Sequence, residues 1–127
     1  MTNNPMRKRK FDLEERTGKF GEEIIRFARK IPQDPITRPL ISQLIRAATS
    51  IGANYCEADD AHSKKDFLHK ISLCRKESRE TKHWLKMIVV ATPAFKAECQ
   101  AYLQEVHELN LIFSAIVNKS RTNQDDQ

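Results

Sequence analysis

The stretch Ser50–Trp84 reads SIGANYCEADDAHSKKDFLHKISLCRKESRETKHW. On both sides of the acidic pair Asp59 and Asp60, apolar side chains recur every three or four residues. That spacing places them on one face of an α-helix. Ser63, followed three residues later by Asp66, is typical of the capping box that starts a helix. The stretch therefore predicts two long helices joined by a short turn.

The flanking sequence adds one helix on each side. Helical spacing of apolar residues predicts helices over about 12–31, 39–58 and 63–91, and a fourth that ends near 119. Pro32, Pro35 and Pro39 separate the first two, because proline lacks a backbone donor, with Pro39 suited to open the second helix. Thr92 as the N-cap and Pro93 after it are typical of the start of the fourth.

Short connections between long helices favour antiparallel neighbours. The fold class predicted is therefore all-α, an antiparallel up-down-up-down four-helix bundle over residues 12–119. Residues 1–11 are expected to form a basic flexible lead-in, and residues 120–127 a flexible tail.

The second helix is apolar on two faces. One face carries Leu40, Leu44 and Ile51, and the other carries Ile41, Ile45 and Tyr55. A helix that is apolar over so much of its circumference needs neighbours on more than one side. One four-helix monomer supplies one core, so the second face predicts subunit contacts in a homo-oligomer. The interface residues expected are Ile41, Ile45, Tyr55 and Trp84.

The composition is that of an ordinary soluble chain. Among 127 residues, 39% are hydrophobic and 31% charged, with a formal net charge of +5. No apolar run is long enough for a membrane span, and the basic N-terminal segment does not lead into an apolar stretch, so we expect a cytoplasmic protein. Cys56, Cys74 and Cys99 form no C-x-x-C pair, which favours reduced thiols in the core.

A polar line follows one side of the second helix. Its members are Gln43, Arg46, Ser50, Asn54 and Glu57. We expect them to pair with Glu77, Glu80 and Thr81 on the third helix in a buried structural network, because polar groups removed from water need partners. A ligand pocket with the same lining is the alternative.

A basic line follows the third helix at spacings of four, three and four residues. It consists of Arg75, Arg79, Lys82 and Lys86, and the N-terminal segment adds Arg7, Lys8, Arg9 and Lys10. Such a row neutralises phosphates without distinguishing bases, which predicts nucleic-acid binding. A solvated helix face is the alternative interpretation.

Catalytic patterns are weak by comparison. Glu80-x-x-His83 resembles half of a carboxylate-bridged dimetal motif, but such sites need two Glu-x-x-His pairs and two further carboxylates. No nucleophile–histidine–acid spacing or phosphate-binding glycine loop occurs in the sequence. We therefore expect no enzyme, no cofactor and no metal, with a metal-dependent enzyme as the remaining alternative.

Two stretches carry a family resemblance. QLIRAATSIGANYCEA (Gln43–Ala58) and SKKDFLHKISLCRKESRETKHWLKMI (Ser63–Ile88) resemble bacterial four-helix-bundle proteins first noticed as products of intervening sequences in large-subunit ribosomal RNA genes. The resemblance implies homo-oligomers, with a pentamer favoured, and no established catalytic activity. A related branch, the accessory variability determinants of diversity-generating retroelements, implies nucleic acid and a reverse transcriptase as partners.

Together these observations predict a non-enzymatic oligomeric protein that binds RNA or DNA, or acts as an adaptor, through a basic surface. The alternative is a protein–protein interaction scaffold without nucleic-acid binding, in which the basic line contacts an acidic partner. No membrane is expected among the partners.

Overall fold

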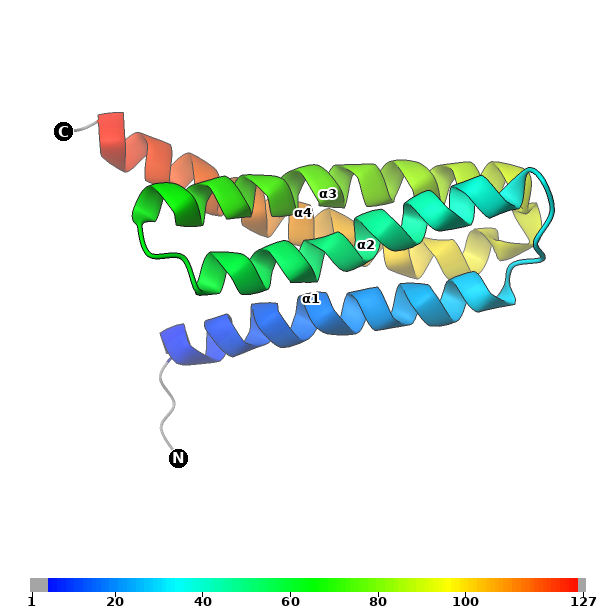
Figure 1. The fold of residues 1–127 in the computed structure, drawn as a ribbon, viewed down its shortest axis with the longest axis horizontal. Coiled ribbons are helices and arrows are strands. Elements are labelled where there is room, and N and C mark those ends of the chain that lie inside the picture. Colours follow the sequence, from blue (N-terminus) through cyan, green and yellow to red (C-terminus); the bar gives the residue numbers. More distant parts are fainter. Residues whose placement is uncertain (1–4, 126–127) are drawn as a thin grey trace.

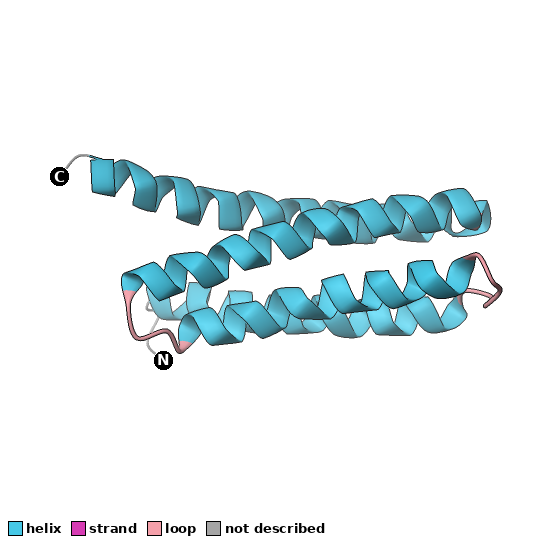
Figure 2. Cartoon of the chain, turned by 45° about the horizontal axis from the view of Figure 1, so that its top comes forward, coloured by secondary structure: helices cyan, strands magenta, loops and turns pink. Residues whose placement is uncertain are grey.

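The computed structural model describes the backbone of residues 5–125 and the side chains of residues 13–120. Four long helices follow one another: α1 (Pro5–Lys30), α2 (Thr37–Asp59), α3 (Lys64–Ala91) and α4 (Lys96–Asp125). A single 3₁₀ turn, η1 (Pro93–Phe95), precedes α4. The helices run alternately in opposite directions along one long axis (Figure 1), and no strand interrupts them anywhere in the described chain (Figure 2). The predicted all-α fold of four helices is confirmed.

The four helices are not equally spaced around the core. Each helix packs closely on the next along the chain, whereas α1 and α4 approach each other at few positions. The largest fully buried side chains come from all four helices and include Phe20, Leu44, Ile71 and Phe113. One core therefore joins the helices, and its widest seam lies between the first helix and the last.

The position of α2 explains its two apolar faces. α2 packs against both α1 and α3, so each face is covered within the chain. Ile41 and Tyr55 are 8% and 6% exposed, and the predicted interface role is wrong for them because a neighbouring helix of the same chain already buries them. Ile45 and Trp84 are half-buried and pack against the same core.

The outer helix ends differ from the sequence prediction. α1 begins at Pro5 rather than near residue 12, and α4 continues to Asp125 rather than ending near 119. Between Met6 and Lys10 the chain has good helix formers, and proline fits the first helical position, so nothing delays the first helix. No glycine or proline follows Pro93, so nothing stops the last one.

Hydrogen bonds at the starts of α2 and α3 show which predicted helix starts the structure contains. The Ser63 hydroxyl accepts a hydrogen bond from the Asp66 amide at 3.1 Å, which confirms the predicted start of α3. α2 begins at Thr37 instead of Pro39, because Asp34 Oδ1 accepts from the amides of Ile36 and Thr37, each at 2.8 Å. These hydrogen bonds hold the pKa of the Asp34 carboxyl below its usual value, since they favour its charged form.

Thr92 is the N-cap residue of η1, with Pro93 after it, but its side chain makes no capping hydrogen bond. Its hydroxyl donates back to the carbonyl of Ile88 at 2.7 Å and so belongs to the end of α3. The chain then passes through η1 before α4 starts at Lys96. A 3₁₀ turn at this point is compatible with Pro93, which has no backbone N–H to donate.

Gly52 allows α1 and α2 to approach closely. A Cβ added at Gly52 would lie 3.4 Å from the carbonyl oxygen of Thr17 and 3.5 Å from the amide nitrogen of Gly18. These are backbone atoms, which cannot rotate away as a side chain can. At Gly18, by contrast, an added Cβ meets nothing within 4 Å.

These two glycines predict opposite responses to substitution. Gly18→Ala should raise the free energy of unfolding by up to about 1 kcal/mol, because alanine favours helix and meets no neighbour. Gly52→Leu should lower it by about 1–3 kcal/mol, because a large side chain forces the helices apart. Urea denaturation followed by circular dichroism measures both. Equal effects of the two substitutions would contradict this account of the α1–α2 contact.

Candidate functional site

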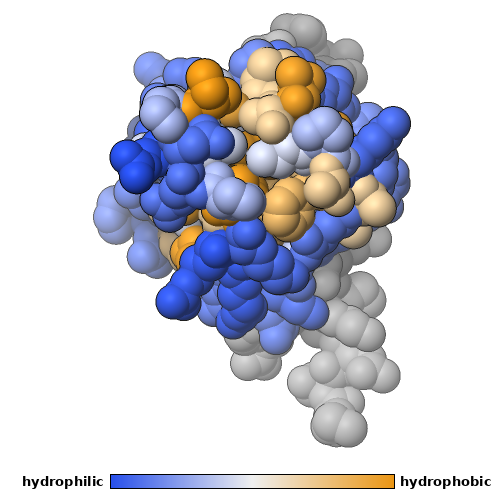
Figure 3. Space-filling model, turned by 90° about the vertical axis from the view of Figure 1, so that its right-hand side faces the viewer, coloured by the Kyte–Doolittle hydropathy of each residue, from blue (hydrophilic) through white to orange (hydrophobic). Residues whose placement is uncertain are grey.

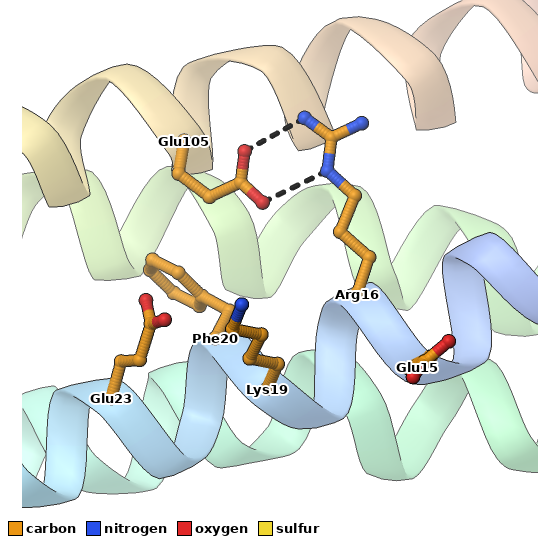
Figure 4. Close-up of a pocket in the computed structure, with 6 residues that line it drawn as sticks. All are labelled: Glu15, Arg16, Lys19, Phe20, Glu23 and Glu105. Atoms are coloured by element: carbon orange, nitrogen blue, oxygen red, sulfur yellow. Dashed lines mark hydrogen bonds and ion pairs between the residues drawn. The ribbon is translucent and has the colours of Figure 1, made fainter.

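Ion pairs bridge the wide seam between α1 and α4. The Arg16 guanidinium donates to both carboxylate oxygens of Glu105, at 2.8 and 2.7 Å (Figure 4). It also donates to Glu108 at 2.9 Å. Lys30 pairs with Glu98 at 2.6 Å near the other end of the seam. The carboxylates of α4 are thus directed towards α1.

A second set of ion pairs lies between α2 and α3. Arg46 donates to Glu80 at 2.5 Å and to Glu77 at 3.3 Å, and also to Gln43 at 3.1 Å. Burial, followed by the charge of Glu80, raises the pKa of Glu77 above its usual value. Closer to the turn, Lys70 pairs with Glu57. The carboxylates in the middle of α3 are thus directed towards α2.

The predicted network on this seam is therefore only partly as expected. Arg46 does meet Glu77 and Glu80, but Gln43, Arg46 and Glu57 are exposed, so the expectation of a buried network is wrong. The reason is that long side chains reach across the seam while their heads stay in water. Three further residues of the predicted network donate hydrogen bonds to backbone carbonyls of their own helices: Ser50, Asn54 and Thr81. Hydroxyl and amide side chains commonly do so inside helices.

The seam between α3 and α4 carries the basic line. Lys82 Nζ lies 3.2 Å from His107 Nδ1 of α4, and Asn110 of α4 donates to the carbonyl of Arg75 at 3.1 Å. Arg79 and Lys86 are exposed, while Arg75 and Lys82 are half-buried. Sequence reasoning missed His107 and Asn110, although their three-residue spacing on α4 places them on a common face.

The paired carboxylates and the unpaired cations therefore lie on different helix–helix seams. Among the side chains described for α3 and α4, every carboxylate except Asp66, in the first turn of α3, pairs with a cation of α1 or α2. No ion pair within residues 13–120 engages the four cations of the basic line. The α3–α4 seam therefore presents positive charge that the chain itself does not neutralise.

The structure describes the backbone of the basic N-terminal residues but not their side chains. Arg7, Lys8, Arg9 and Lys10 belong to the first turns of α1, and their side chains lie outside those that the structure describes. Because α1 and α3 run in the same direction, these turns lie at the end of the bundle where α3 begins (Figure 1).

Other candidate sites offer less chemistry. A groove of about 410 Å³ lies between α1 and α4, but its lining mixes Glu15, Arg16, Lys19, Glu23 and Glu105 with one aromatic ring (Figure 4). In the part of the chain with described side chains, no three His, Cys, Asp or Glu residues gather as a metal site would require. Glu80 is engaged by Arg46, and His83 lies edge-on to Trp84.

The three cysteines differ in environment. Cys74 and Cys99 are fully buried, and burial raises the pKa of their thiols to about 12 and about 11. Cys56 is exposed, so the expectation of a core thiol is wrong there. It lies near the end of α2, where it lines a groove together with Glu14 and Gly18 of α1.

Fold and charge define a small basic all-α bundle, and comparison with known proteins identifies its family. The model for the 23S rRNA-intervening sequence protein matches residues 9–115, and the chain belongs to that family. A crystal structure of a protein with unknown function from the S23 ribosomal protein family of Bacteroides thetaiotaomicron is similar at 24% identity, covering 83% of this chain and 97% of that one. Its TM-score of 0.72 shows a shared fold.

A search of curated proteins gave no match. Within the described residues, no helix is both long and apolar enough to cross a membrane.

The cysteine environments predict selective labelling. In the native protein at neutral pH, a thiol reagent should modify Cys56 alone, because the thiolate is the reacting species and the two buried thiols stay protonated. In denaturant all three should react. Mass spectrometry counts the adducts, and Cys56→Ser should remove native labelling. Rapid modification of Cys74 or Cys99 in the folded protein would contradict the described core.

Proposed function

We propose that this protein is a non-enzymatic nucleic-acid-binding module, or an adaptor for nucleic acid, and that the α3–α4 seam is its phosphate-binding surface. The observation that carries the proposal is the sorting of charge among the seams. Carboxylates that would neutralise the basic line are held by Arg16, Lys30 and Arg46 on other seams. The net charge of +5 is therefore not spread evenly over the surface.

The geometry of the line suits a phosphate backbone. From Arg75 to Lys86 the helix rises about 16 Å, at about 1.5 Å per residue. Several successive phosphates of one strand fit along that length, since they follow each other at roughly 3.4 Å of helical rise. Arginine and lysine heads bound to phosphate release counterions, which drives binding without distinguishing sequence.

Little in the seam would distinguish bases. Stacking of unpaired bases needs exposed aromatic rings, and the one tryptophan, Trp84, is half-buried and packs against the core. We therefore propose weak sequence preference, with RNA and DNA both bound.

We further propose that the protein acts as a homo-oligomer, and as a pentamer on the family resemblance. Exposed apolar side chains support assembly: Ile25, Ile36, Val90 and Leu111 are 41%, 66%, 75% and 55% exposed. Figure 3 shows apolar side chains gathered at one end of the bundle among hydrophilic ones. Repetition of the basic line in each subunit would multiply the contacts made with one nucleic acid.

An interaction scaffold is the second candidate. Lys86 and Val90, four residues apart on exposed turns of α3, place an apolar side chain beside a cation. An acidic partner helix with apolar anchors would fit such a surface. A reverse transcriptase is one protein partner that the resemblance suggests.

Charge reversal tests the proposed surface. Arg75, Arg79 and Lys82 are changed together to glutamate, and binding to labelled RNA and DNA is measured across a salt series. The wild-type affinity should fall steeply with salt, and the variant should lose roughly two to three units of that log–log slope.

The control changes net charge by the same amount elsewhere. Lys19, Arg26 and Arg29 are exposed on α1, away from the α3–α4 seam, and are changed to glutamate together. This variant should keep most of the salt slope. Equal losses in both variants would mean that binding follows net charge and not the seam. No binding by the wild type at low salt would favour the scaffold.

The assembly is tested by mass in solution. Light scattering should give a multiple of the 14.7 kDa subunit, with a fivefold multiple for the proposed pentamer. Trp84, the one tryptophan, reports on its surroundings, and its emission should shift to longer wavelength on dilution if subunit contacts cover it. A monomer at all concentrations would refute the oligomer.

A further inference from the structure

Among the described side chains, the basic line meets a titratable group of α4 where Lys82 contacts His107. Lys82 Nζ lies 3.2 Å from His107 Nδ1, and both side chains reach the surface. An ammonium has only donors, so it donates and the imidazole nitrogen accepts. Nδ1 can accept this hydrogen bond only in a ring that carries its proton on Nε2 alone.

We propose that Lys82 and His107 form a phosphate clamp in which His107 takes up a proton when a phosphodiester of a bound nucleic acid enters. The inference rests on the proposed function of the α3–α4 seam and adds a residue of α4 to it. A phosphate oxygen accepts from both Lys82 and protonated His107. The proton comes from solvent, and no covalent bond forms or breaks.

Cationic side chains lie close to His107, so its ring gains a proton favourably only together with a bound phosphate. On α3, His107 faces Lys82, with Arg79 and Lys86 one turn to either side along the same line. On its own helix the adjacent charged group is Glu108, which is held by Arg16 and Gln104; Glu105 is held by Arg16 as well. Cations therefore dominate the side towards α3.

Proton and phosphate should consequently bind cooperatively. Without an anion, a protonated His107 places two positive charges about 3 Å apart, which is unfavourable. A phosphodiester between them removes that repulsion and gains a second charged donor. Since the coupling is reciprocal, lower pH must tighten phosphate binding as phosphate favours the proton.

The test is nucleic-acid affinity as a function of pH at fixed salt. Between about pH 8 and about pH 6, where imidazoles titrate, affinity for the labelled RNA should rise roughly three- to tenfold. A phosphodiester does not change charge in this range, so the proton must bind to the protein. Calorimetry in two buffers of different ionisation enthalpy measures the proton uptake in the unmodified protein.

Substitutions identify which histidine responds. His107→Gln cannot take up a proton and should abolish most of the pH dependence, whereas His62→Gln, in the connection between α2 and α3, should keep it. Circular dichroism checks that the variants are folded, which the exposure of both histidines favours. His107→Lys carries a permanent charge and should bind at about pH 8 as the wild type does at about pH 6.

The outcomes separate this inference from the proposed function. Salt-sensitive binding without proton uptake, or unchanged pH dependence in His107→Gln, overturns the clamp and leaves the nucleic-acid surface intact. Absence of binding at either pH overturns both.

Discussion

The packing of α2 between α1 and α3 is the constraint on which the rest of the structure depends. Gly52 lets the backbones of α1 and α2 approach, with no room for a large side chain above Thr17. On the other side, α2 contributes Leu44 and Ile51 to the core shared with α3. With its central helix covered twice, the chain needs few close approaches between the backbones of α1 and α4.

That arrangement also determines where charge is neutralised. Among the described side chains, α1 and α2 supply the cations that engage the carboxylates of α4 and α3. Arg16 and Arg46 each hold two carboxylates. Such partly exposed pairs add little to stability, since water and salt screen them. Their larger effect is to direct negative charge away from the α3–α4 seam.

The sequence predicted well where the helices lie, but poorly which parts of the molecule pack against each helix face. Proline positions and helical spacing identify four helices, and Ser63 marks the start of α3. The apolar pattern of α2 shows that two faces are covered, but it does not say by what. Ile41 and Tyr55 are covered by the same chain, a fact that depends on how the helices are arranged in space. The basic line follows from spacing, whereas its contact with His107 depends on the rotation of α4, which no local pattern specifies.

The sparse contact between α1 and α4 has a consequence for the order in which the bundle opens. α1 and α4 each pack closely on one neighbouring helix, whereas the contact between them rests on partly exposed ion pairs and on the ring of Phe27 against that of Tyr102. Regions with the fewest buried contacts open most often in the native state. α1 and α4 are therefore the helices whose amide hydrogens exchange first, and added salt, which weakens the Arg16 and Lys30 pairs, speeds their exchange while α2 and α3 stay protected.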